Sequence, residues 1–136
     1  MLFRSPDRVH FVGPLLGNIA TEFTPPDWWD ELKGDLPVVH VTQGTITTDP
    51  ERLIIPTIQA LASENVLVVA TTFDRILPDG IPANARIASF IPHAQLLPHV
   101  DVMITNGGFN GVQMALAHGI PVIGAGKSEE IGRAHV

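Results

Sequence analysis

The stretch of this sequence best suited to chemistry is a glycine-rich hexapeptide at residues 106–111, Asn-Gly-Gly-Phe-Asn-Gly, between an apolar run and a helix-forming segment. Glycines at a strand-to-helix turn let a ligand approach the backbone closely, because they carry no Cβ. The free N–H groups and the positive dipole end of the following helix favour an anion such as a diphosphate. For this hexapeptide alone, a turn without any ligand is the alternative. Neither the dinucleotide-binding fingerprint nor the lysine-bearing phosphate loop occurs in the chain.

Other kinds of site find less support. No two of the 6 histidines stand four residues apart on a helix with an acid nearby, so their spacing disfavours a metal site. No serine lies in a nucleophile elbow, and the lack of cysteine excludes a disulfide framework and a thiolate metal site. Asp27, Asp30 and Glu31 are interpreted as solvated helix caps. Trp28 and Trp29 are expected to pack against the domain and not to stack on a substrate.

Composition indicates one acidic domain with a real core. The chain has 136 residues, 45% of them hydrophobic, and a formal net charge of -6 with 8 scattered Lys and Arg. Without clustered cations, neither a nucleic acid nor an anionic membrane is an expected partner. The longest apolar runs are far shorter than the roughly 20 residues that cross a bilayer. Residues 1–7 lack a hydrophobic signal core, so we expect a cytoplasmic protein.

The elements that must position the hexapeptide alternate along the chain from residue 36 onward. The pattern predicts strands at 38–42, 66–70, 86–90, 102–104 and 121–123, and helices at 28–32, 50–61, 94–97 and 110–118. Short apolar strands that alternate with helices are typical of a parallel sheet covered on both faces. Right-handed crossovers then predict a doubly wound α/β sheet.

Individual residues are expected to set the ends and bends of these helices. Asp27 and Asp49 are N-cap candidates. Pro56 removes a backbone hydrogen bond and predicts a kink within the helix at 50–61. Gly119 is expected to end the helix at 110–118 in the left-handed conformation.

Ligands of doubly wound sheets bind beyond the carboxyl ends of the strands, where the strand order reverses. Three polar, glycine- or proline-bearing loops follow predicted strands there, at residues 43–45, 90–93 and 106–111. We therefore expect them to converge on one site. Because no Lys or Arg is near the hexapeptide in sequence, backbone N–H groups and the helix dipole should carry the charge of a bound diphosphate.

Several stretches in this order resemble the donor-binding signature of the UDP-glycosyltransferases, most closely that of the bacterial macrolide-type enzymes. They are Phe-Ile-Pro-His at 90–93, Leu97, Asp101, the hexapeptide, and His-Gly-Ile-Pro at 118–121. Residues 41–45 are similar to the family's first strand and phosphate-contacting turn, and residues 12–15 to its interdomain linker. The resemblance covers roughly residues 9–129. It implies the C-terminal, Rossmann-like half of a GT-B fold, truncated at its C-terminus.

The resemblance implies a donor-binding site made of Gly44, Thr45, Phe90, Ile91, His93, Asn106, Gly107, Gly108, Asn110 and Gly111. Phe90 stands where the family usually has a tryptophan that stacks on the nucleobase, and a smaller ring still offers a π-face. The backbone of Ile91 would meet the edge of the base. Gly44 and Thr45 would approach the diphosphate, and residues 108–111 would form the phosphate-binding turn.

Three positions depart from the family pattern. Asn106 replaces a histidine that donates to the diphosphate in many members, and a neutral amide should give a weaker contact. Met114 stands where an acidic or amide residue typically holds the ribose hydroxyls, which a thioether cannot do. Gln113 lies about 100° round the helix and is a poor replacement. His93 replaces a frequent glutamine.

The resemblance also implies a domain organisation. Residues 1–35 are interpreted as the end of a preceding domain and an interdomain linker, and residues 36–129 as an incomplete nucleotide-sugar-binding domain. Residues 130–136 read like a translated sequencing adapter and are expected to be a non-native tail. The family's N-terminal domain holds the acceptor and the catalytic base, so no catalytic residue is assigned to this chain. A truncated sheet is expected to leave apolar surface uncovered.

The function implied is the donor-binding part of a glycosyltransferase. The parent would move a hexosyl group from a UDP- or TDP-linked sugar to a hydroxylated small molecule, without a metal or another cofactor. One alternative is a non-catalytic nucleotide-sugar-binding subunit that pairs with a separate acceptor-domain protein. A second is an enzyme of the nucleotide-sugar 2-epimerase type, whose acidic and basic active-site residues are not found in this chain.

Overall fold

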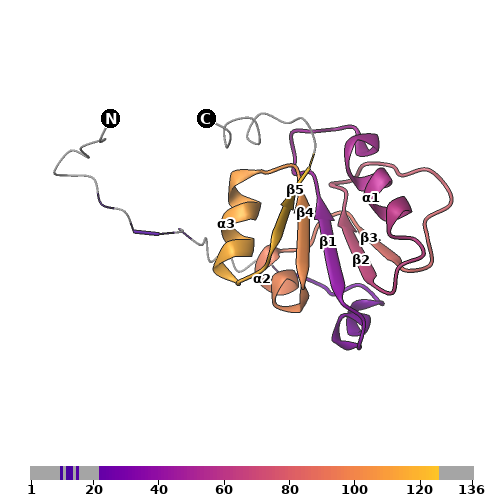
Figure 1. The fold of residues 1–136 in the computed structure, drawn as a ribbon, viewed down its shortest axis with the longest axis horizontal. Coiled ribbons are helices and arrows are strands. Elements are labelled where there is room, and N and C mark those ends of the chain that lie inside the picture. The colour runs from indigo at the N-terminus through magenta and orange to yellow at the C-terminus, as the bar shows by residue number, and fades with distance from the viewer. Residues whose placement is uncertain (1–9, 11, 14, 16–21, 126–136) are drawn as a thin grey trace.

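A five-stranded, all-parallel sheet forms the centre of the molecule (Figure 1). The computed structural model describes residues 10, 12, 13, 15 and 22–125. The strands are β1 Val38–Thr42, β2 Leu67–Thr71, β3 Ala85–Ala88, β4 Val102–Thr105 and β5 Val122–Gly124, in the spatial order β3-β2-β1-β4-β5. The chain therefore builds outward from β1 to β3 and then returns to add β4 on the other side of β1. The strand order reverses between β1 and β4.

Side chains of β1 and β2 alternate between two cores, one on each face of the sheet, as the doubly wound prediction requires. Val41 and Val68 pack with α1 (Ile54–Ala60) on one face. Val38 and Val69 face the other core, with α2 (His93–Leu96) and α3 (Phe109–Ala117). In Figure 1, α1 lies beside β2 and β3, and α2 and α3 lie toward β4 and β5. The predicted fold class is confirmed.

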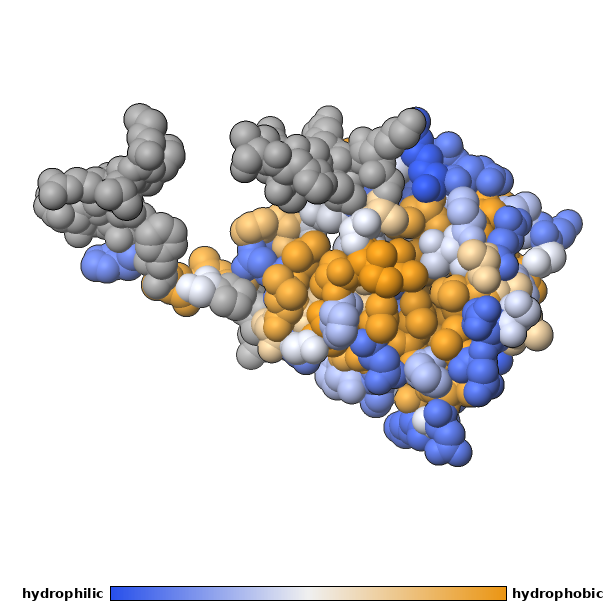
Figure 2. All heavy atoms as spheres, viewed as in Figure 1, coloured by the Kyte–Doolittle hydropathy of each residue, from blue (hydrophilic) through white to orange (hydrophobic). Residues whose placement is uncertain are grey.

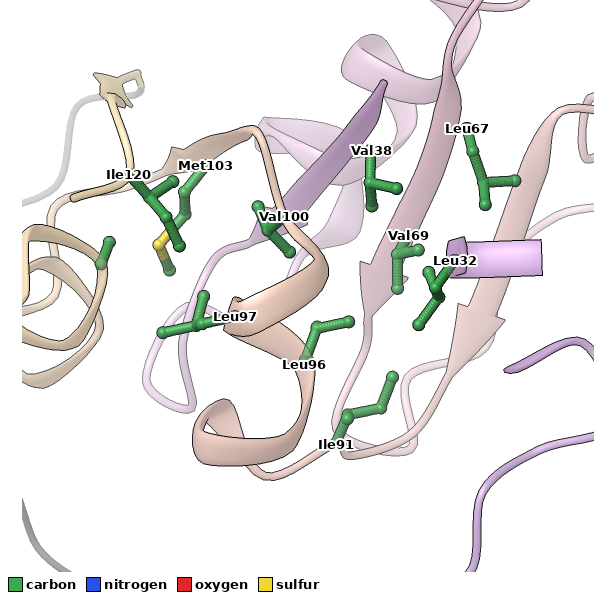
Figure 3. Close-up of a cluster of buried hydrophobic side chains, with 11 residues drawn as sticks. Leu32, Val38, Leu67, Val69, Ile91, Leu96, Leu97, Val100, Met103 and Ile120 are labelled. Atoms are coloured by element: carbon green, nitrogen blue, oxygen red, sulfur yellow. The ribbon is translucent and has the colours of Figure 1, made fainter. Parts of the chain in front are cut away.

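The second core also includes the segment that precedes the sheet. In Figure 3, Leu32 converges with Leu96 of α2 and Val69 of β2. Leu32 belongs to the 3-10 helix η1 (Trp29–Lys33) and is only 5% exposed. The Trp29 ring lies 5.7 Å from the His99 ring, so the tryptophan pair packs against the domain, as predicted.

Two predictions about helix boundaries are wrong. The segment at 50–61 is not one helix kinked at Pro56: a 3-10 helix η2 (Pro50–Arg52) is separated from α1 at Leu53, whose φ of -147° is not helical. Pro56 then falls in the first turn of α1, where its missing N–H breaks no hydrogen bond. Asp27 is not a cap either, because Trp28 takes the N-cap position without a side-chain hydrogen bond.

Two other predicted helix ends are confirmed. Asp49 caps η2, because its carboxylate accepts the Glu51 N–H at 3.0 Å. Gly119 ends α3 with a φ of 70°. Its N–H donates to the Leu116 carbonyl and the Ile120 N–H donates to the Ala115 carbonyl, so two carbonyls of the last turn are satisfied.

Apolar side chains gather at the surface on one side of the described part of the molecule. Figure 2 shows apolar atoms gathered over β4 and β1. A shallow apolar groove lies there between α1 and β4, lined in part by Leu53, Pro56, Ile104 and Ala125. The predicted adapter-derived tail, residues 130–136, lies outside the described residues.

Candidate functional site

A cavity of about 630 Å³ opens at the carboxyl ends of β1 and β4, where the strand order reverses. This is the position at which doubly wound sheets bind ligands. Most of the predicted site residues line it, namely Gly44, Thr45, His93, Asn106, Gly108, Asn110 and Gly111. The loops at 43–45 and 106–111 therefore converge as expected.

Phe90, Ile91 and Gly107 are the predicted site residues that do not line this cavity. The Phe90 ring is 53% exposed and lies 6.0 Å from the ring of Phe73, which does line it. The side chain of Ile91 is buried in the core, so only its backbone remains for the role implied by the family. Gly107 has a φ of 91°, which favours glycine at this turn.

The turn after β4 presents unsatisfied backbone donors to the cavity. Gly108 is the N-cap of α3, and the first intrahelical hydrogen bond at this end runs from the Val112 N–H to the Gly108 carbonyl at 3.1 Å. The N–H groups of Phe109, Asn110 and Gly111 have no acceptor within the described part of the chain. Together with the positive end of the helix dipole, such donors favour an anion.

The glycines of this turn do not all serve the same purpose. A Cβ added at Gly108 would meet nothing closer than the Asn106 Oδ1 at 3.9 Å, so the space above Gly108 is open. A Cβ at Gly111 would lie 3.2 Å from the Met103 Cε in the core. Gly111 therefore also permits α3 to pack closely on β4.

Asn106 links the two loops. Its Nδ2 donates to the Gln43 carbonyl at 2.7 Å and to the Thr47 Oγ1 at 3.3 Å. Gln43, fully buried, donates in turn to the carbonyls of Thr47 and Asp49. The amide nitrogen of Asn106 thus holds the loop after β1, and the phosphate contact implied by the family resemblance stays a prediction.

Two arginines that were not among the predicted site residues lie beside this site. Arg52 lines the cavity, and the Arg75 guanidinium donates to the carbonyls of Gly44 and Thr45, both at 3.1 Å. Although no Lys or Arg is near the hexapeptide in sequence, Arg52 is thus near it in space, and the expectation that backbone and dipole carry the charge of a bound diphosphate stays a prediction. Arg75 follows β2, and the ends of neighbouring parallel strands lie at the same edge of a sheet. That proximity was the available signal.

Two histidine rings, one of which lines the cavity, contact each other edge to face. His40 of β1 is fully buried, its Nδ1 lies 3.0 Å from the Val69 carbonyl, and its ring is 6.1 Å from that of His93. Burial lowers the pKa of His40 to about 4. Burial, and then the charge of His118, also lower the pKa of His93. Both rings are therefore neutral at neutral pH and add no positive charge to the site.

The remaining departure from the family pattern, Met114, has a packing role in the structure. Met114, on α3, packs against the hydrophobic core and not into the cavity. It therefore supplies packing at the position where the family resemblance implies a ribose ligand. Among the described residues, no three His, Cys, Asp or Glu side chains are grouped closely enough to hold a metal ion. No described helix combines the length and apolar character that a membrane span requires.

A family model described as "UDP-glucoronosyl and UDP-glucosyl transferase" matches residues 11–126. The chain belongs to this family. The resemblance seen in the sequence is thereby confirmed, and the parallel sheet is the Rossmann-like half of its GT-B fold.

Curated members of this UDP-glycosyltransferase family are similar over most of the chain. It is 56% identical over 125 residues to the 4'-demethylrebeccamycin synthase of Lentzea aerocolonigenes, covering 92% of this chain and 30% of that protein. It is 43% identical over 131 residues to the UDP-glucosyltransferase avaP of Aspergillus versicolor, covering 90% of this chain and 28% of that protein. The chain thus spans less than a third of the length of these relatives.

A solved structure of the glycosyltransferase VinC in complex with DTDP shares the fold. It superposes with a TM-score of 0.57 at 25% identity, over 82% of this chain and 29% of that one.

Proposed function

We propose that this chain is the donor-binding part of a glycosyltransferase that moves a hexosyl group from a nucleoside diphosphate sugar to a hydroxylated small molecule. The observation that carries the proposal is the cavity between β1 and β4, into which the first turn of α3 presents N–H groups without acceptors. Such N–H groups suit a diphosphate, which every nucleoside diphosphate sugar contains. A cytoplasmic location belongs to the same proposal.

The chemistry proposed for this half of the enzyme is stabilisation of the leaving group. In an in-line displacement, negative charge develops on the diphosphate as the bond to the sugar breaks. The glycine turn at the N-terminus of α3, the loop at Gly44 and Thr45, and Arg52 surround the space where that charge would lie. The family's catalytic base belongs to the acceptor-binding domain, so we expect this chain by itself to transfer no sugar.

The nucleobase is proposed to stack on Phe90, beyond the cavity on the Phe73 side. VinC was solved with DTDP and avaP is named a UDP-glucosyltransferase, so thymidine and uridine diphosphates are both candidate ligands. A half-exposed aromatic ring offers a π-face to either pyrimidine. The backbone of Ile91, the next residue, would contact the edge of the base.

Calorimetric titration of the purified 136-residue chain with UDP and TDP tests the proposal. We expect a one-site isotherm with at least one of them, weaker binding of the corresponding monophosphate, and no change on adding EDTA. Inorganic phosphate serves as the control for non-specific anion binding. No heat of binding with either diphosphate, or equal affinity for the nucleoside and its diphosphate, would contradict the proposed function.

A further inference from the structure

Arg75 binds the loop after β1 through two hydrogen bonds of its guanidinium group. One guanidinium nitrogen, Nη1, donates to the carbonyls of Gly44 and Thr72, and the other, Nη2, donates to the Thr45 carbonyl, all at 3.1 Å. The guanidinium also lies 5.8 Å from the centre of the Phe73 ring. A planar fork with fixed donors is suited to holding two successive carbonyls in one orientation.

This orientation decides where the neighbouring N–H groups point. In a trans peptide the carbonyl and the N–H of the same plane point in opposite directions. The carbonyls of Gly44 and Thr45 face Arg75, so the N–H groups of Thr45 and Ile46 face away from it. Gly44, Thr45 and Ile46 line the cavity, whereas Arg75 does not. The two N–H groups therefore lie on the cavity side, and neither has an acceptor among the residues described.

The turn that carries Arg75 is strained. Phe73 and Asp74 have φ values of 51° and 62° and are the non-glycine residues with positive φ in the described part of the chain. Each such position costs on the order of 1 kcal/mol or more and persists only where surrounding contacts impose it. Here Ser89 bonds both the N–H and the carboxylate of Asp74. The turn thus fixes the direction in which Arg75 leaves β2.

We propose that Arg75 is a positioning residue for the donor: it holds the Thr45 and Ile46 N–H groups toward the diphosphate of a nucleoside diphosphate. Two successive backbone N–H groups that point to one side form an anion-binding concavity. The diphosphate then lies between this pair and the first turn of α3. The proposal rests on the proposed function, and it assigns to Arg75 an effect on the phosphates that is transmitted through the backbone.

The experiment uses the 136-residue chain and whichever of UDP and TDP binds it more tightly, together with the corresponding nucleoside. Arg75→Met should weaken binding of the diphosphate about tenfold or more, because two charge-assisted hydrogen bonds that orient the loop are lost. Binding of the nucleoside should not change. Arg75→Lys keeps the charge but cannot bridge both carbonyls, so it should also lose diphosphate affinity. Arg86, on β3, pairs with Glu31 of η1, and Arg86→Met is the matched control, which should keep full affinity.

Amide resonances provide a readout that general damage to the fold would not produce. In the unsubstituted chain, the diphosphate should move the Thr45 and Ile46 amide protons downfield, together with those of the first turn of α3. In Arg75→Lys, only the signals of α3 should move. Unchanged diphosphate affinity in both variants overturns the inference, as does an equal loss for diphosphate and nucleoside. If the unsubstituted chain binds no diphosphate, the proposed function itself fails.

Discussion

The side-chain amide of Asn106, just past β4, donates to the backbone carbonyl of Gln43, just past β1, at 2.7 Å. This hydrogen bond spans the point at which the strand order reverses, so it joins the two loops that line the cavity. The Gln43 side chain holds the same loop from beneath through the carbonyls of Thr47 and Asp49. The two amides thus keep the loop after β1 in place before any ligand arrives, which lowers the ordering cost of binding.

Replacement of Asn106 tests this link. Asn106→Ala should weaken diphosphate binding by about 1 kcal/mol, the typical net worth of a neutral hydrogen bond, and should lower the free energy of unfolding by a similar amount. Asn106→Asp should weaken binding further, because a carboxylate would face both the Gln43 carbonyl and the anionic ligand. Calorimetry and urea unfolding measure the two effects. Gln59→Ala, on the exposed side of α1, is the control. If it lowers affinity and stability as much as Asn106→Ala does, Asn106 has no specific role in the site.

His40 should make the stability of the protein depend on pH. Burial lowers its pKa from 6.5 to about 4 in the folded state, so between these values the unfolded chain binds more protons. The free energy of unfolding should therefore be highest above pH 6.5 and fall as the pH is lowered toward 4, by at most about 1.4 kcal/mol per pH unit for this group. His93, whose pKa is also lowered, acts in the same direction.

Urea unfolding of His40→Val between pH 7 and 4.5 isolates the contribution of His40. The variant should show a shallower decline with acid than the unsubstituted chain, because no imidazole remains to be protonated at this position of β1. Val39→Ala, on the same strand, should lower stability at every pH and keep the original slope. Parallel slopes in all three proteins would show that the His40 imidazole is not buried in neutral form.

The sheet could be predicted from the sequence because its signals are local. Each apolar run and its following turn report burial and chain reversal within a few residues, and Gly119 marks the end of α3 by itself. The break at Leu53 was missed for a related reason: a proline in an apolar periodic segment indicates a bend but not on which side of the proline it falls. Here the chain breaks before Pro56 and keeps the proline in the first turn.

The site could be predicted from the sequence only where its groups lie together in one short stretch. The glycine turn at 106–111 holds its donors within a few residues, so its chemistry is visible in sequence. The Arg75 contacts are made to residues about thirty positions earlier, which sequence spacing does not reveal. The use of the Asn106 amide as a link to Gln43 likewise depends on the pairing of β1 with β4.

Leu32 should matter for stability although it lies within the segment predicted to be a linker. It is 5% exposed and packs in the core cluster with Val69 and Leu96. Leu32→Ala should cost about 2 to 4 kcal/mol of unfolding free energy, the range for large-to-small changes in a core. Leu36→Ala, at a position that is 40% exposed, should cost much less. Equal losses in chemical denaturation would mean that η1 does not stay docked in solution.

Phe90 should contribute to binding of the base and not of the phosphates. Phe90→Ala should weaken binding of UDP or TDP by about 1 to 3 kcal/mol, as expected for loss of a ring on which a base stacks. Phe90→Trp should restore or improve affinity through its larger π-face. Ile76→Ala, at an exposed position of the neighbouring loop, is the control. Calorimetry decides the point, and a Phe90→Ala variant with full affinity would place the base elsewhere.

Gly108 should be needed for ligand binding but should matter little for folding. Its φ of -56° suits any residue, and an added Cβ would only reach ordinary contact distance from the Asn106 Oδ1. Gly108→Val should therefore fold, at a cost of about 1 kcal/mol for a poorer N-cap residue. Its side chain would occupy the space in front of the first N–H groups of α3, so binding of a nucleoside diphosphate should be abolished.

Gly119→Ala, at the other end of α3, is the control for Gly108→Val, and it should lower stability without affecting binding. At a φ of 70°, a Cβ strains the backbone, so this variant should lose about 1 kcal/mol or more of stability. It should bind the diphosphate normally, because Gly119 does not line the cavity. Thermal melts and calorimetry on both variants separate the two effects. If Gly108→Val keeps its affinity while Gly119→Ala loses it, the diphosphate does not lie at the N-terminus of α3.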